Sequence, residues 1–172
     1  MKTVVVINGA GGVGKDTLCN IIAKKYKCSN ESSIIPIKEI AAKYGGWNGE
    51  KDAKSRKFLS DLKLLFSEYN NLSFNYLLTR VEVFNSCQNT EVLFVHIREP
   101  DEIEKFTKAV RNMGIRCVSL LITKENSETW GNMADDNVNN YNYDYYYYNC
   151  LSLKETHKAF TTFFEYLILG QV

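Results

Sequence analysis

The sequence predicts an α/β fold with a mostly parallel sheet of about five strands. Short apolar runs rich in β-branched residues alternate with segments whose apolar residues recur every three or four positions. The first run, residues 4–7, leads directly into a glycine cluster, which suits a buried strand that turns into a helix. The length of 172 residues fits one domain, and 45% hydrophobic residues can supply its core. We therefore expect a single domain over residues 1–172.

The first half of the chain contains one further strand, at residues 33–35, and four helices. The first helix begins at Lys15 and the second near Ile37. The third and fourth occupy the two segments on either side of Asn70 and Asn71, in which apolar residues recur at helical spacing. Glycines at 45–49 separate the second helix from the third. The apolar residues expected to face inward are Leu18, Ile21, Ile22 and Tyr26 in the first helix, Phe58, Leu62, Leu65, Phe66 and Tyr69 in the third, and Phe74, Leu77, Leu78, Val81 and Phe84 in the fourth.

Three more strands follow, at residues 92–97, 115–122 and 143–148. A helix with Pro100 in its first turn comes after the first of these. A final helix begins at the capping box formed by Ser152 and Glu155. Its expected inward residues are Leu153, Phe160, Phe164 and Leu167.

Composition argues against several classes of function. A net charge of +1 gives no electrostatic signature of nucleic-acid or anionic-membrane binding. The N-terminal apolar run is far too short to span a membrane. The five cysteines are scattered without metal-ligand spacing, which favours reduced thiols and a cytoplasmic protein.

Residues 9–15 read Gly-Ala-Gly-Gly-Val-Gly-Lys and match the phosphate-binding pattern G-x-x-x-x-G-K between a strand and a helix. In such a loop successive amides face a phosphate, the helix N-terminus adds positive charge, and the lysine bridges the terminal phosphates. A glycine-rich turn that binds nothing is the plain alternative, and Lys15 disfavours a dinucleotide loop. The expected nucleotide-binding residues are Gly9, Gly11, Gly12, Val13, Gly14, Lys15, Asp16 and Thr17.

Asp16 stands where this pattern has Ser or Thr, and Thr17 follows it. This Gly-Lys-Asp-Thr sequence resembles P-loop nucleoside and nucleotide kinases, particularly phage-type deoxynucleoside monophosphate kinases, adenylate-kinase-like proteins and animal-type phosphomevalonate kinases. The resemblance implies a three-layer α/β/α P-loop kinase fold that binds ATP and Mg²⁺. It also implies that Asp16 and Thr17 organise the metal, because Mg²⁺ takes oxygen ligands and retains waters.

Other segments extend the resemblance. Residues 47–52 and 56–59 look like the acceptor-side helices of such kinases, residues 97–102 resemble their post-strand arginine segment, and residues 143–153 are similar to their final strand and helix. The resemblance implies an acceptor-side helical insertion at about 45–88. It also implies a lid at about 123–142, a long polar segment that can also be disordered.

Phosphoryl transfer requires aligned substrates and neutralised charge, so basic residues near the loop are candidates. Arg56 and Arg98 are the expected acceptor-binding, catalytic partners of Lys15, although Arg56 can also be a solvated charge. Lys124 is a candidate nucleotide contact in a segment that otherwise lacks arginine, or an exposed strand-end residue. His96 stands where related kinases often have an acid, and we favour a hydrogen-bonded interior histidine over a base. Arg80 and Arg111 are interpreted as surface charges.

These features predict an ATP-dependent phosphotransferase whose acceptor is a small molecule, most simply a nucleoside or deoxynucleoside monophosphate. Two alternatives stay open: a kinase for a non-nucleotide phosphorylated molecule such as phosphomevalonate, and a non-catalytic ATP-binding regulatory protein. His96 and the arginine-poor lid segment motivate the second alternative.

Overall fold

The structure is a computed structural model that describes residues 2–125 and 137–169. Five strands form one sheet in the order β2-β3-β1-β4-β5, and every neighbouring pair is parallel. β1 therefore lies at the centre, and the loop that follows it emerges between the ends of β3 and β4. The strands are β1 (Thr3–Asn8), β2 (Cys28–Ser32), β3 (Val92–His96), β4 (Arg116–Thr123) and β5 (Tyr145–Tyr148).

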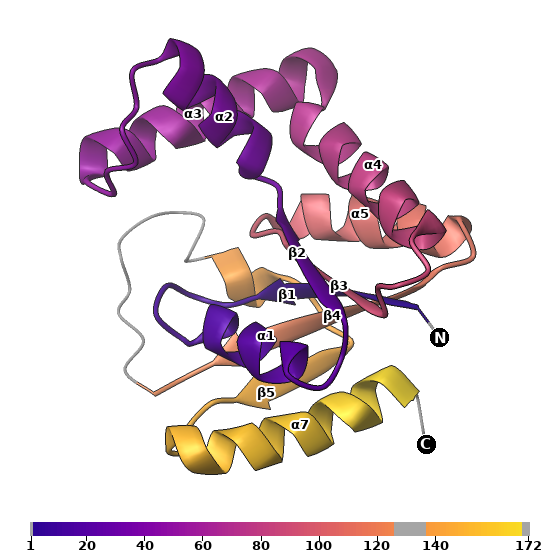
Figure 1. Cartoon of the computed structure of the whole chain (residues 1–172). Coiled ribbons are helices and arrows are strands. Elements are labelled where there is room, and N and C mark those ends of the chain that lie inside the picture. The colour runs from indigo at the N-terminus through magenta and orange to yellow at the C-terminus, as the bar shows by residue number, and fades with distance from the viewer. Residues whose placement is uncertain (1, 126–136, 170–172) are drawn as a thin grey trace.

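Helices cover both faces of this sheet, which confirms the three-layer α/β/α architecture (Figure 1). One face carries α1 (Lys15–Ala23) and α7 (Leu153–Leu169), and the other carries α4 (Leu72–Ser86) and α5 (Pro100–Asn112). Two further helices, α2 (Ile35–Tyr44) and α3 (Ala53–Asn70), form a pair beyond the end of β2 (Figure 1). A short 3₁₀ helix spans Asn137–Asn140.

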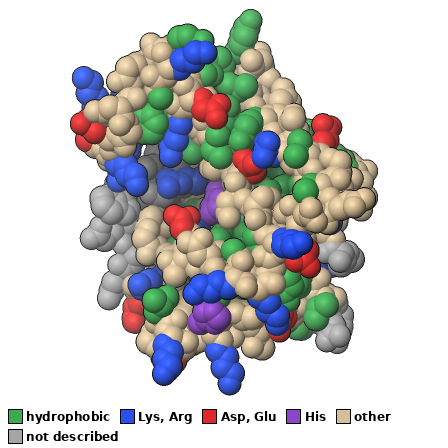
Figure 2. Space-filling model, in the orientation of Figure 1, with side chains coloured by type: hydrophobic (Ala, Val, Ile, Leu, Met, Phe, Trp, Pro, Cys, Tyr) green, Lys and Arg blue, Asp and Glu red, His purple; other side chains and the backbone are tan. Residues whose placement is uncertain are grey.

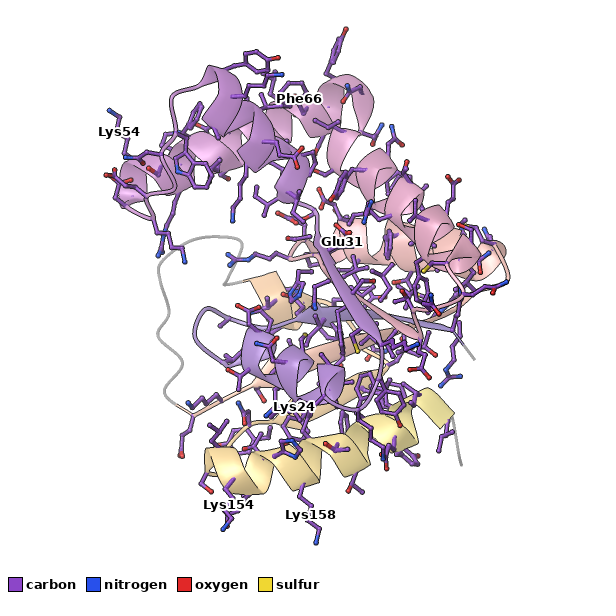
Figure 3. All side chains as sticks on the ribbon, viewed as in Figure 1. Lys24, Glu31, Lys54, Phe66, Lys154 and Lys158 are labelled. Carbon is purple, nitrogen blue, oxygen red and sulfur yellow. The ribbon has the colours of Figure 1, made fainter. Side chains whose placement is uncertain are left out.

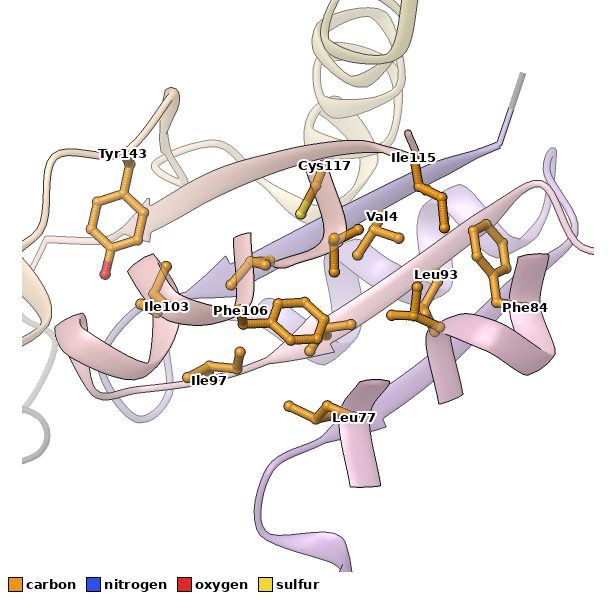
Figure 4. Packing of buried hydrophobic residues seen from close by; sticks show 14 of the residues in the cluster. Val4, Leu77, Phe84, Leu93, Ile97, Ile103, Phe106, Ile115, Cys117 and Tyr143 are labelled. Carbon is orange, nitrogen blue, oxygen red and sulfur yellow. The ribbon is translucent and has the colours of Figure 1, made fainter. Parts of the chain in front are cut away.

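Side chains of β1 alternate between two cores. Val4 and Val6 pack with the helices α4 and α5, while Val5 and Ile7 pack with α1 and α7. Figure 4 shows the first of these cores, in which Phe106 and Leu77 from the helices meet the strands. A third, smaller cluster around Ile37, Ala41 and Leu59 joins α2 to α3. The α2–α3 pair thus has a core of its own at one end of the sheet.

The second strand differs from the prediction. It spans Cys28–Ser32, whereas residues 33–35 form a turn and the start of α2, in which Pro36 occupies the first turn. The sequence Cys-Ser-Asn-Glu-Ser has no apolar run, because β2 is an edge strand that pairs only with β3. Hydrophobic patterning therefore could not locate it.

Two helix faces were predicted only in part, since Leu62 and Phe66 of α3 and Phe160, Phe164 and Leu167 of α7 do pack inward. In α3 the side chains of Phe58, Leu65 and Tyr69 are exposed, and the buried positions are Leu59 and Lys63. The helix packs on the small α2 helix and on α4, so only a narrow stripe of it is covered. Leu153 is 68% exposed because it begins α7, before the helix reaches the sheet. No helix in the described ranges has the length and apolarity of a membrane span.

Candidate functional site

The loop after β1 has a backbone that only glycine accommodates readily at three positions. Gly12 and Gly14 have positive φ angles of 79° and 94°, and Gly14 forms the N-cap of α1. At Gly9 a Cβ atom would lie 2.4 Å from the carbonyl oxygen of Ile122 in β4. The chain thus curls closely against the sheet and enters α1 with the amides of the helix N-terminus at the end of the central strand.

Two asparagines fix this loop, and sequence reasoning identified neither of them. Asn8 is buried, and its Oδ1 accepts from the Gly9 amide at 2.8 Å. Its Nδ2 donates to the Arg98 carbonyl and to the Tyr143 hydroxyl. At the other end of the loop, Asn149 Nδ2 donates to the Val13 carbonyl at 2.9 Å. For Asn8 a signal existed, since a polar residue ends an otherwise apolar strand just before the glycines.

Lys15 lies with the loop, in the position that its motif predicts. Its Nζ donates to the carbonyl oxygens of Gly9 and Ala10, the latter at 2.8 Å. The side chain therefore folds back along the loop, and its ammonium group lies beside the backbone that would surround a phosphate. This places a positive charge next to the positive end of the α1 dipole.

Asp16 and Thr17 are exposed in the first turn of α1. Their carboxylate and hydroxyl oxygens are the donor type that Mg²⁺ prefers, and one carboxylate with waters and phosphates is a common Mg²⁺ environment. The chemistry of this donor pair thus fits the metal that the sequence suggests. The acidic side chain also lies at the favourable end of the helix dipole.

His96 ends β3 and pairs in register with Ile7 of the central strand. Since Val92 and Phe94 of the same strand face α1 and α7, alternation places the His96 side chain on that face as well. It is half-buried, and burial lowers the pKa of its ring, with a smaller opposing influence from Asp16. A largely neutral imidazole therefore borders the loop, rather than lying in the deep interior.

The predicted arginines and Lys124 occupy three different places. Arg98 is exposed just beyond β3, at the same sheet edge as the loop, and Asn8 holds its carbonyl. Arg56 is exposed in the first turn of α3, where its Nε donates to the Lys51 carbonyl at 2.9 Å. Lys124 is exposed next to the end of β4. Figure 2 shows basic side chains gathered at a hollow between the α2–α3 pair and the side of the molecule that carries α1.

Lys63 connects α3 to the start of α5, a role that sequence reasoning missed. Its side chain is buried, and its Nζ lies 2.5 Å from Glu99 Oε2 and 2.8 Å from Glu102 Oε2. Burial alone would raise the pKa of Glu99, but the Lys63 charge brings it below its ordinary value. The pKa of Glu102 is raised, because burial and the Glu99 charge outweigh Lys63. These ion pairs tie the α2–α3 pair to the helix that follows Arg98.

Arg80 and Arg111 keep 41% and 49% of their side-chain surface exposed, in line with the prediction, but each also forms an ion pair. Arg80 Nε lies 2.6 Å from Glu31 Oε1, and Tyr76 donates to the other oxygen of that buried carboxylate. Figure 3 shows Glu31 on β2, near α4. Arg111 Nη2 pairs with Asp144 at 2.8 Å. Both arginines join a helix to the sheet and lie outside the loop site.

The predicted lid segment falls partly outside the described residues, since residues 126–136 lie there. Its returning end is described: Tyr143 donates to the Val138 carbonyl and accepts from Asn8. Burial raises the pKa of Tyr143 to about 12, so its hydroxyl stays protonated. The chain that re-enters the sheet is therefore anchored at the start of the loop.

A shallow groove of about 770 Å³ lies at the opposite edge of the sheet, around the beginnings of β4 and β5. Arg116 and Asp144 are among its lining residues. Open α/β sheets bind ligands beyond the carboxyl ends of their strands, which is the edge that holds the glycine loop. The loop, and not this groove, is therefore the candidate site.

Comparison with known proteins identifies the fold. No model of a known protein family and no curated protein matches the sequence. Among solved structures, the Deinococcus radiodurans tunicamycin resistance protein aligns with a TM-score of 0.58 and 11% identity, over 94% of this chain and 95% of that chain. A Chloroflexus aurantiacus protein provisionally described as a kinase aligns with a TM-score of 0.52 and 8% identity, over 95% and 96%. Together with the strand order and the loop after β1, these alignments show that the chain has a three-layer α/β/α fold with a P-loop motif after its first strand.

Proposed function

We propose that this protein is an ATP-dependent phosphotransferase that uses a small molecule as acceptor. The observation that carries the proposal is the loop of residues 9–15, which turns tightly at the end of the central strand and opens α1 with Lys15 beside it. Backbone amides, a helix N-terminus and a lysine at one point form a site for the phosphates of a nucleotide. The fold similarity to the Chloroflexus aurantiacus protein described as a kinase supports the same assignment.

Each group at the loop has a distinct task in this proposal. The amides of the loop bind phosphate oxygens, and Lys15 neutralises charge on the transferring group. Asp16 and Thr17 would hold the nucleotide's Mg²⁺, which would reduce the negative charge of the phosphates. Phosphoryl transfer needs little covalent participation by the protein, so positioning and charge suffice.

The acceptor would bind between the loop and the α2–α3 pair. Arg98 follows the strand next to β1, and a guanidinium matches a phosphate with two parallel hydrogen bonds. Arg56 on α3 is the second acceptor contact in this proposal, and Lys124 contributes to the nucleotide side. A nucleoside or deoxynucleoside monophosphate is the acceptor we favour, since two arginines suit an anionic molecule.

One observation favours a second function. The strand beside β1 ends in His96, so no carboxylate assists the metal from that position. Burial lowers the pKa of the His96 ring, which keeps it largely neutral. A protein that binds ATP as a regulator, without turnover, would tolerate this arrangement. A kinase whose acceptor is a non-nucleotide phosphate would keep the loop and change only the acceptor contacts.

The test is coupled ADP release with ATP·Mg²⁺ against each common nucleoside and deoxynucleoside monophosphate, and against phosphomevalonate. A Lys15→Met variant provides the blank, and Lys154→Met, an exposed lysine on α7, serves as the matched control. We expect release that depends on Lys15 with at least one acceptor. Silence with every acceptor while ATP still binds would favour the regulatory function.

A further inference from the structure

We infer that Asn149 is a positioning residue that orients the Gly14 amide toward bound phosphate, an inference that rests on the proposed function. Asn149 follows the last strand and lies 136 residues away from Val13 in the sequence. Its Nδ2 nevertheless donates to the Val13 carbonyl oxygen at 2.9 Å. A side chain from the C-terminal part of the chain thus hydrogen-bonds to the backbone near the end of the glycine loop.

This hydrogen bond sets the direction of one peptide group. No described peptide bond is cis, so the Val13 carbonyl and the Gly14 amide point in opposite directions. Because Asn149 draws the carbonyl to its own side, the Gly14 amide points away from Asn149. No acceptor for that amide exists within residues 2–125 and 137–169. An amide that points away from its neighbours at the start of α1 is available to a phosphate oxygen.

Asn149 is itself held rigidly enough to do this. Its backbone amide donates to the Thr123 carbonyl at 2.8 Å, which fixes it to the end of β4. Its side chain also packs on the loop, since a Cβ atom on Gly14 would lie 2.8 Å from Asn149 Nδ2. The positive φ of Gly14 and the closeness of Asn149 both require glycine at that position. Without the Asn149 donor, the Val13–Gly14 peptide would be free to rotate, and the amide would lose its fixed direction.

Two variants remove the donor: Asn149→Ala and Asn149→Leu, of which the second keeps a side chain of similar size. The control is Asn112→Ala, an exposed asparagine at the end of α5. Two ligands are titrated by calorimetry, ATP·Mg²⁺ and inorganic tripolyphosphate, which has phosphates but no base. We expect both ligands to bind about tenfold more weakly to each Asn149 variant, the effect of one lost hydrogen bond to a charged group. The control should bind like the unmodified protein.

A second readout separates positioning from mere support of the fold. In ¹⁵N-labelled protein the Gly14 amide resonance should shift when tripolyphosphate is added, and the shift should shrink in Asn149→Leu while the thermal unfolding midpoint stays close to that of the unmodified protein. If the unmodified protein binds neither ligand, the proposed function falls and this inference with it. If it binds both and the variants bind tripolyphosphate equally well, only the inference about Asn149 is overturned. A role in which Asn149 contacts only the nucleotide base would give that second result.

Discussion

Gly9 marks the point where the central strand ends against a neighbouring backbone. A side chain there would meet the Ile122 carbonyl oxygen at 2.4 Å and the Val13 side chain at 3.0 Å. The first of these neighbours belongs to β4 and cannot move without breaking the sheet. Gly12, by contrast, has a positive φ of 79° but open space around it. Gly12 therefore shows the conformational requirement alone, whereas Gly9, with a φ of 146°, has a steric requirement in addition.

We predict that Gly9→Ala lowers the free energy of unfolding by about 3 kcal/mol, because it combines backbone strain with a clash. Gly12→Ala should cost about 1 kcal/mol, the strain of a left-handed residue alone. Urea unfolding of both variants measures the difference. Equal losses would contradict the close approach of the loop to β4.

Lys63 shares its charge between two carboxylates in a largely buried place. We predict that Lys63→Met lowers the free energy of unfolding by about 2 kcal/mol at about pH 8. This is less than for a fully buried pair, since Glu99 and Glu102 are partly exposed. Lys57→Met, which removes an exposed pair with Asp61 on the same helix, is the control and should change little.

The sign of the pH dependence follows from the loss of the cation. Without Lys63, both carboxyl groups have folded-state pKa values above their unfolded ones, so their ionisation destabilises the variant as the pH rises. The loss of unfolding free energy caused by Lys63→Met should therefore be smaller at about pH 5, where more of these carboxyl groups are protonated. If this loss is the same at both pH values, the ionisation of Glu99 and Glu102 does not depend on the charge of Lys63.

At the scale of elements, α4 is fastened to the edge strand by charge as well as by its apolar face. Glu31 on β2 is buried and accepts from both Arg80 and Tyr76 of α4. Burial and the bond to Glu31 raise the pKa of Tyr76 to about 12. The edge strand, which lacks apolar residues facing the helix, is thus held by this polar contact.

We predict that Arg80→Ala lowers the free energy of unfolding by about 1–2 kcal/mol, because it leaves a buried carboxylate without its cation. Adding Glu31→Gln should recover part of that loss, since the side chain then carries no charge. A double-mutant cycle by urea unfolding measures the coupling between the two residues. If the double variant is as unstable as the sum of the two single variants, the pair contributes nothing.

Whether the sequence predicted an element correctly depended on how that element is buried. β1, β3 and β4 are buried on both faces, so their apolar runs identified them. β2 lies at the edge with a polar sequence and was misplaced. In α3, periodicity pointed to Phe58, Leu65 and Tyr69, whereas contacts with only one side of the helix left them exposed. Local patterning thus works where burial surrounds an element and fails where neighbours cover only part of it.

At the scale of the whole molecule, the site residues that are contiguous in the sequence were predictable, and those that act through distant contacts were not. The glycines and Lys15 of the loop are contiguous, so spacing alone predicted them. Asn8, Asn149 and Lys63 contribute through contacts with residues 36 to 136 positions away, which a single sequence does not reveal. The roles of Arg56, Arg98, Asp16, Thr17 and Lys124 stay predictions, and the acceptor panel and the metal dependence of turnover test them.

With a net charge of +1, the molecule has no general attraction for anions. Any nucleotide affinity must therefore come from a local site, and the central claim is that the loop of residues 9–15 is the main part of that site. The most direct measurement is calorimetric titration of ATP·Mg²⁺ into the unmodified protein and into Lys15→Met, after unfolding curves confirm that both are folded. We predict saturable binding to the unmodified protein and at least about tenfold weaker binding to the variant. Equal binding to both proteins, or none to either, would contradict the claim that this loop is a nucleotide site.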